Sequence, residues 1–292
     1  MKRFCNQIVL VILLATLVTV DNAKAQGQPP MGMTIETFEL VDTNQQPWSL
    51  ADQSDAKLVV VAFLGTECPL VKLYADRLNQ MSRDLASQSV TFVGINSNQQ
   101  DSLAEIQHFV RSFDLAFPIL KDPGNRVADA FGATRTPEVI VLDQDRRVVY
   151  RGAIDDQNTY GIQQTTAKHH YLRDAINCLL VGKQVETAYT QAVGCIIGRR
   201  HQVDESSPVS YAGQIAGLLQ RKCVQCHRSG EIAPFALTSY SEVAGWAGMI
   251  EEVVREQRMP PWHADAPPGH FKNDIRLTEA EKELIYQWVK AG

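Results

Sequence analysis

Apolar and polar residues follow two different periodic patterns along this chain. Between residues 38 and 199, short apolar runs alternate with longer segments in which apolar residues recur at helical spacing. We expect strands at residues 58–64, 90–95, 117–120, 138–142 and 148–150, and helices at residues 69–86, 103–113, 126–131 and 167–180. This order predicts an α/β domain, in which helices cover a central sheet.

The pattern changes near residue 201. Residues 201–210 are mostly polar, which predicts a linker between a first domain at 26–200 and a second at 211–292. Apolar residues then recur at helical spacing over 212–226, 241–257 and 278–289. Thr278, followed by Glu281, forms a capping-box pattern that marks the start of the last helix. The second domain is therefore expected to be small and all-α.

Cys223, Cys226 and His227 lie in one pentapeptide, CVQCH, at the end of the first of these helices. Two thiols three residues apart can add to the two vinyl groups of a porphyrin, and the adjacent imidazole can bind its iron. The pentapeptide therefore predicts one covalently attached haem c. Half of a zinc site and a simple disulfide are the alternatives.

A second axial ligand to the iron is expected from the residues after this motif. Met259 is our preferred candidate, because Pro260 and Pro261 follow it and hold it on a stiff extended loop. The other candidates are Met249, His263 and His270.

The N-terminus predicts export. Lys2 and Arg3 precede an apolar run at 8–20, and small residues follow, so residues 1–25 resemble a signal peptide and the mature chain would begin at Gln26. The run is shorter than the roughly 20 residues needed to cross a bilayer. We therefore expect a periplasmic or otherwise exported protein with no stable membrane span after cleavage. A net charge of −5 argues against nucleic-acid binding.

Cys68 is the candidate reactive thiol of the first domain. It follows an apolar strand and precedes a helix whose first residue is Pro69, a position that suits proline. Free backbone N–H groups and the helix dipole at this point stabilise a thiolate, so a lowered thiol pKa is expected. Arg135 could stabilise the same thiolate, although an exposed arginine is the simpler interpretation.

Two segments around this thiol carry a family resemblance. FLGTECPLVK, at residues 63–72, resembles the active-site stretch of thioredoxin-like proteins, and FGATRTPEVIVLD, at 131–143, resembles their proline loop. The resemblance is to redoxins, which include alkyl hydroperoxide reductase-like and thiol-disulfide oxidoreductase proteins. It implies a thioredoxin-like fold with a central mixed sheet flanked by helices. It also implies that Thr136 and Pro137 lie against Cys68, and that the substrate is a thiol, a disulfide or a peroxide.

The chain departs from both standard versions of this active site. A dithiol oxidoreductase would carry a second cysteine at Val71, and a typical peroxiredoxin would carry threonine and proline at Gly65 and Val61. Cys195, in VGCIIGR, resembles a C-terminal cysteine of some redoxin-like proteins, which implies a Cys68–Cys195 pair. A structural Cys178–Cys195 disulfide is the competing arrangement.

The second domain carries a resemblance of its own. RMPPWHAD, at 258–265, and the residues after it make the segment 210–292 resemble the cytochrome c-like module of exported bacterial multidomain proteins. The resemblance implies that Cys223, Cys226 and His227 bind haem and that Met259 is the sixth ligand. In relatives this module often lies beside redoxin or copper monooxygenase-like domains. Such relatives often continue beyond the last helix, so a truncated gene product is one expectation.

Together these observations predict an exported oxidoreductase that couples thiol chemistry at Cys68 and Cys195 to one-electron transfer through a haem. Its partners would be a redox protein or small electron donor, and a thiol, disulfide or peroxide substrate. Two alternatives stay open at this point. One is a non-catalytic electron carrier or redox sensor, and the other is the electron-donating front part of a copper monooxygenase-like assembly.

Overall fold

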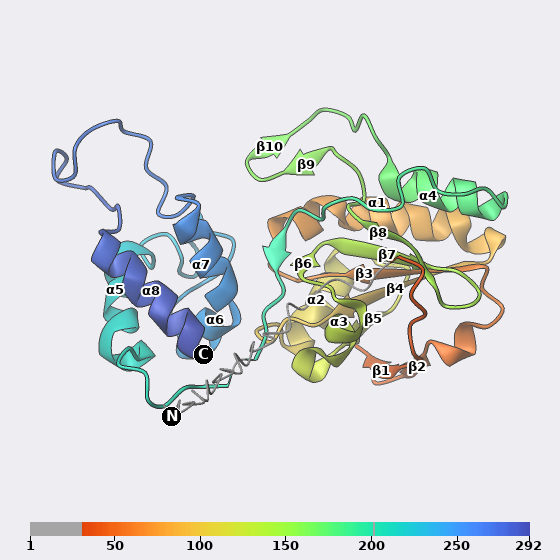
Figure 1. Ribbon diagram of the computed structural model, residues 1–292, viewed down its shortest axis with the longest axis horizontal. Coiled ribbons are helices and arrows are strands. Elements are labelled where there is room, and N and C mark those ends of the chain that lie inside the picture. Colours follow the sequence, from red (N-terminus) through yellow and green to blue (C-terminus); the bar gives the residue numbers. More distant parts are fainter. Residues whose placement is uncertain (1–30, 201) are drawn as a thin grey trace, which may run out of the picture.

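The computed structural model describes residues 31–200 and 202–292, which form a sheet-containing part and a helical part (Figure 1). The signal peptide predicted at residues 1–25, with its cleavage point, lies outside the described residues. Among the described helices, none combines the length and the apolar composition that crossing a bilayer requires.

A seven-stranded mixed sheet forms the centre of the first part, in the order β2-β1-β5-β4-β3-β7-β8. The neighbours β3 and β4 are parallel, as are β4 and β5, and the other neighbouring pairs are antiparallel. The strands are β1 Glu39–Asp42, β2 Pro47–Ser49, β3 Leu58–Phe63, β4 Val90–Asn96, β5 Ile119–Lys121, β7 Glu138–Leu142 and β8 Val148–Gly152. The family resemblance implies such a mixed sheet, whereas β1 and β2 were not among the strands predicted from the sequence.

Helices cover both faces of this sheet. The helices are α1 Pro69–Leu85, α2 Leu103–Ser112, α3 Arg126–Phe131 and α4 Tyr171–Leu180. Successive residues of β3 point to opposite faces, so Val60 packs with α1 and α4 while Val61 packs with α3. The strand is buried on both sides, which explains its uninterrupted apolar sequence.

Helix α4 begins later than the sequence predicts. The carboxylate of Asp156 accepts hydrogen bonds from the backbone N–H groups of Lys168 and His169, at 2.8 and 3.0 Å. These bonds hold the segment before Tyr171 in a loop, so the helix starts at residue 171 and not at 167.

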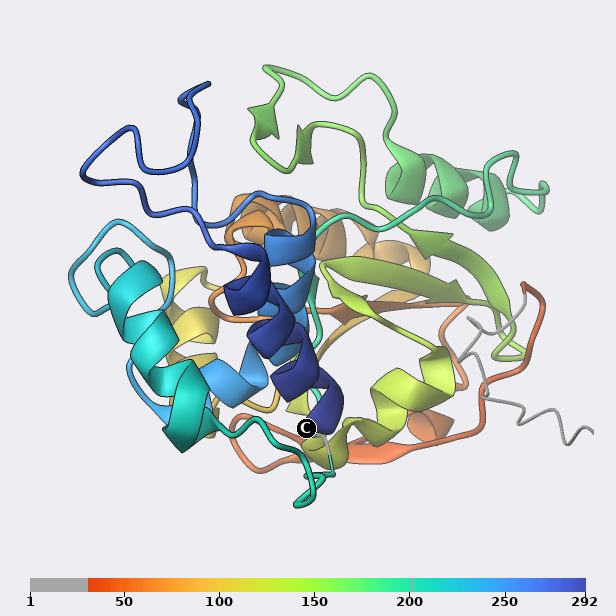
Figure 2. The ribbon, with the colours of Figure 1, turned by 60° about the vertical axis from the view of Figure 1, so that its left-hand side comes forward.

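The part after residue 202 is built from helices. A short π-helix at Tyr211–Ile215 leads into α5 Ala216–Lys222, and α6 Tyr240–Gly245, α7 Ala247–Arg255 and α8 Glu279–Ala291 follow. Helices α7 and α8 lie side by side in both views (Figures 1 and 2). The capping box at Thr278 is present, with the hydroxyl accepting the N–H of Glu281 at 3.2 Å.

Two helix predictions need correction here. Helix α5 ends at Lys222, because the N–H groups of Cys223 and Val224 both bond to the carbonyl of Leu219 and close the last turn. The predicted helix 241–257 is divided at Trp246, where the backbone leaves the helical conformation.

The two parts share one hydrophobic core. Buried residues of the sheet's α1 face and buried residues of the C-terminal helices form a single contacting cluster, which includes Leu70, Cys195, Met249 and Ile285. The C-terminal helices therefore pack on the end of the sheet domain at which Cys68 lies.

Candidate redox site

Cys68 occupies the start of α1. Its backbone is extended, with φ −71° and ψ 118°, and Pro69 begins the helix after it. The side chain is fully buried, and its sulfur donates to the carbonyl oxygen of Thr136 at 3.0 Å. The structure thus brings together the cysteine and the proline loop that the sequence places in one site.

The proline loop is formed by the short strand β6, Arg135–Thr136, and the residue after it. The peptide bond between Thr136 and Pro137 is cis. The carbonyl of Thr136 faces Cys68, and the strand β7 begins directly after Pro137.

Cys195 reaches the same site from a distant part of the chain. It lies on β11, Cys195–Ile196, which pairs antiparallel with β6 and places Cys195 opposite Thr136. Gly194 precedes it at φ +155°, and a Cβ atom there would lie 2.0 Å from the carbonyl oxygen of Thr136. Only glycine allows this close approach. Cys178, by contrast, is half-buried on α4.

The two thiols have opposite acidities. Burial by itself would raise the pKa of Cys68, but hydrogen bonds from the side chain and backbone of Cys195 and from the backbone of Val71 outweigh it and lower the pKa to about 7. The hydrogen bond to Cys68, together with burial, raises the pKa of Cys195. Cys68 is therefore the more acidic thiol of the pair, and Cys195 keeps its proton when Cys68 ionises.

A buried carboxylate positions the loop before Cys68, and the sequence carried no signal for it. One oxygen of Asp101 accepts the backbone N–H of Thr66 at 2.9 Å and the side-chain amides of Asn96 and Asn98 at 2.6 and 3.1 Å. The side-chain oxygen Oδ1 of Asn98, in turn, accepts the N–H of Gly198 at 3.0 Å. This network ties the segment that carries Cys195 to the segment that carries Cys68.

Arg135 is not the exposed side chain that the sequence favoured. It donates to the carbonyl of Gly194 at 2.8 Å and to the hydroxyl of Tyr160 at 2.9 Å. It also forms an ion pair with Glu252 on α7, and Glu252 pairs in addition with Arg258. Arg135 therefore joins the proline loop to the helical part.

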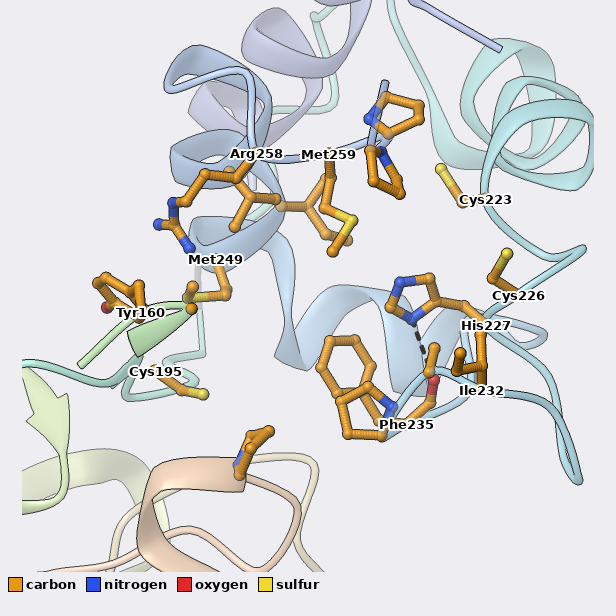
Figure 3. Close-up of a pocket in the computed structure, with 18 of the residues that line it drawn as sticks. Tyr160, Cys195, Cys223, Cys226, His227, Ile232, Phe235, Met249, Arg258 and Met259 are labelled. Atoms are coloured by element: carbon orange, nitrogen blue, oxygen red, sulfur yellow. Dashed lines mark hydrogen bonds between the residues drawn. The ribbon is translucent and has the colours of Figure 1, made fainter. Parts of the chain in front are cut away.

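A cavity of about 660 Å³ lies between the two parts (Figure 3). Figure 3 shows Cys195 and Met249 on one side and Cys223, Cys226 and His227 on the other. Further apolar lining comes from Leu70, Ile232, Pro234, Phe235, Ile250, Val254 and Ile285. The structure thus gathers Cys223, Cys226 and His227 around one apolar space that Cys195 also lines.

The imidazole of His227 has a fixed orientation. Its Nδ1 lies 3.1 Å from the carbonyl oxygen of Phe235, which leaves Nε2 for a ligand. The ring of Phe235 stacks on Trp246, with centroids 4.0 Å apart. Burial lowers the pKa of His227, which favours the neutral form that binds iron.

The methionine candidates occupy different places. Met259 lines the cavity and is 40 % exposed, and its peptide bond to Pro260 is cis. Met249 is buried on α7, and its sulfur accepts the N–H of Ile196 at 3.4 Å. His263 and His270 belong to the loop before α8 and are not part of the cavity lining.

These residues fit a haem c. The cavity is apolar, two thiols and an imidazole lie on one wall, and a thioether lies within the same lining. Figure 3 shows the Met259 sulfur directed into the space that the His227 ring faces.

A buried cysteine at a helix start, set against a proline loop in a mixed sheet, defines a thioredoxin-like thiol protein. Residues 30–168 match the Redoxin family model. The thiol-disulfide oxidoreductase ResA of Bacillus subtilis is 30 % identical over 145 residues, which span 49 % of this chain and 79 % of ResA. The chain therefore belongs to the redoxin family.

Two solved structures resemble the same part of the chain. A hypothetical protein from Sinorhizobium meliloti 1021 is 31 % identical, with a TM-score of 0.55 over 60 % of this chain and 98 % of that one. An uncharacterised conserved protein from Geobacillus kaustophilus is 28 % identical, with a TM-score of 0.55 over 60 % and 94 %. The family match ends at residue 168, so the helical part lies outside it.

Proposed function

We propose that this protein is an exported thiol oxidoreductase that is coupled to one-electron transfer through a c-type haem. Cys68 and Cys195 would form the thiol pair. Cys223 and Cys226 would hold the haem covalently, and His227 and Met259 would bind its iron. The relative ResA is named a thiol-disulfide oxidoreductase, which supports the first half of the proposal.

The thiol chemistry follows from the acidities of the pair. The Cys68 thiolate attacks a disulfide or peroxide, which leaves a mixed disulfide or a sulfenic acid on Cys68 and releases a thiolate or a hydroxide or alkoxide. Cys195 then attacks the Cys68 sulfur and gives its proton to the leaving group. The product is a Cys68–Cys195 disulfide, and the substrate has gained two electrons.

The haem site supplies the other half. When bound, the haem exchanges single electrons with a redox partner. His227 would bind the iron through Nε2, because Phe235 already engages Nδ1. The lining of this space is mostly apolar, which suits a porphyrin ring.

One observation carries the coupling of the two halves. Cys195 lies opposite Thr136 beside Cys68 and also lines the cavity that contains the CVQCH residues. A side chain that belongs to both sites is what an electron-coupled thiol protein requires.

The test uses protein made in a host competent for cytochrome maturation. We expect the exported form to begin at Gln26 and to carry the mass of one haem, and C223A and C226A variants to lose covalent attachment. After peroxide treatment, mass spectrometry should show a Cys68–Cys195 disulfide, which a C68S variant cannot form although its haem spectrum is unchanged. A mass equal to the polypeptide alone would reject the haem. If C68S left all redox behaviour unchanged, the protein would be an electron carrier only.

A further inference from the structure

The segment at residues 193–198 covers a strand edge beside the thiol. Its strand β11 pairs with β6, and the N–H of Ile197 bonds to the carbonyl of Thr134 at 2.9 Å. An uncovered strand edge offers backbone donors and acceptors to an extended peptide. Here the edge next to the proline loop is already occupied by the chain's own residues.

The covering segment is held from both sides. On the sheet side, Gly194 packs so closely on the backbone of Thr136 that a residue with a Cβ atom would not fit at position 194. On the helical side, Met249 accepts the N–H of Ile196, and α7 is fixed to the proline loop by the Arg135–Glu252 ion pair. That ion pair is largely buried, with the two side chains 23 % and 14 % exposed.

This packing decides what can reach the thiols. Cys68 is 0 % exposed and Cys195 is 7 % exposed. The strand edge beside Cys68 is closed to an extended polypeptide as long as β11 pairs with β6 and α7 packs against β11. A molecule of a few atoms needs a much smaller opening.

We propose that residues 193–198 act as an intramolecular pseudosubstrate. They occupy the strand edge that a peptide would use, so they restrict the thiol pair to small oxidants and exclude polypeptide disulfides. The inference rests on the proposed thiol function. The Cys68 thiolate attacks one sulfur of a small disulfide, a mixed disulfide forms and one thiolate leaves. Cys195 then displaces the second thiol and gives up its proton, so the small disulfide is reduced by two electrons and the pair is oxidised to a disulfide.

The experiment compares two disulfides in single-turnover reactions of the reduced, full-length holoprotein. One is 2-hydroxyethyl disulfide and the other is insulin. The rate at which the protein reduces each disulfide is divided by the rate at which dithiothreitol reduces the same disulfide, which corrects for their different reactivities. Mass spectrometry of quenched samples counts the Cys68–Cys195 disulfide formed. We expect the normalised rate with insulin to be lower by about 100-fold, as it would be if the open form were about 1 % of the population.

Two variants on one helix test the role of the cover. E252Q removes the ion pairs of Glu252 to Arg135 and to Arg258. We expect its rate with insulin to rise several-fold while its rate with 2-hydroxyethyl disulfide is unchanged. The matched control is E251Q, because among the described residues Glu251 pairs only with Arg255 at the surface. E251Q should behave as the unmodified protein does.

The outcomes separate the two proposals. Equal normalised rates with the two disulfides in the unmodified protein would overturn the exclusion of polypeptides and leave the thiol function standing. Failure of both disulfides and of hydrogen peroxide to oxidise the pair would reject the thiol function, and the inference with it. An E252Q protein as slow with insulin as the unmodified protein would overturn the role given to α7.

Discussion

The acidity of Cys68 depends on its neighbour at position 195, and this dependence can be measured. The pKa of Cys68 is about 7, compared with 9.0 for an ordinary cysteine thiol. This lowering of the pKa corresponds to roughly 3 kcal/mol in favour of the thiolate. At pH 7 about half of Cys68 is therefore thiolate, compared with about 1 % of an ordinary thiol.

Two substitutions separate the hydrogen bond from the space that the side chain fills. C195A removes the donor while burial of Cys68 still favours the neutral thiol, so we expect the Cys68 pKa to rise by at least about one unit. C195S keeps a donor of similar size, and its Cys68 pKa should stay near that of the unmodified protein. At neutral pH, C195A should therefore contain about tenfold less thiolate than C195S.

The assay is the pH dependence of alkylation by iodoacetamide, measured on the reduced protein between pH 5 and pH 10. Mass spectrometry of the peptide that contains Cys68 measures the alkylation of this thiol separately from that of the other cysteines. The rate should rise with pH as the thiolate forms, with a midpoint near 7 in the unmodified protein and in C195S. Identical midpoints in C195A and C195S would refute the assignment of this hydrogen bond.

Three further predictions concern packing, charge and the second axial ligand. Gly194→Ala should lower the free energy of unfolding by about 2–5 kcal/mol through overlap and backbone strain, whereas Gly182→Ala, with nothing within 4 Å of the added atom, should cost about 1 kcal/mol in urea titrations. Glu138→Ala should cost about 3–5 kcal/mol, because it leaves the buried Arg151 without its ion-pair partner, and a loss below about 1 kcal/mol would contradict that account. Met259→Ala should keep the covalent haem mass but change the visible spectrum of the oxidised form, and an unchanged spectrum would remove Met259 as the ligand.

The sheet and its helices were predictable because their signals are local. The apolar run at 58–64 is buried on both faces of the sheet, and Pro69 after Cys68 marks the start of α1 as the sequence indicates. The start of α4 was misplaced, because a carboxylate at Asp156 competes for backbone N–H groups and no periodicity reveals such a contact.

The site was predictable only in part. Cys68 and Pro137 lie in recognisable segments, whereas the place of Cys195 came from a resemblance and depends on pairing between distant strands. Asp101 and the ion pair of Arg135 with Glu252 carried no signal, because both depend on contacts between residues far apart in the sequence. The roles of such side chains can be assigned only from the folded structure.

The cavity between the two parts also has a consequence for biogenesis. Its walls come from both parts, and Cys223 and Cys226, both half-buried, are among the residues that line it. If these thiols receive a porphyrin as proposed, the ring has to enter a space that the sheet domain also borders, so attachment would be easier before the C-terminal helices dock. Haem attachment would then come before the C-terminal helices dock, and a chain whose helices docked first would tend to remain without haem.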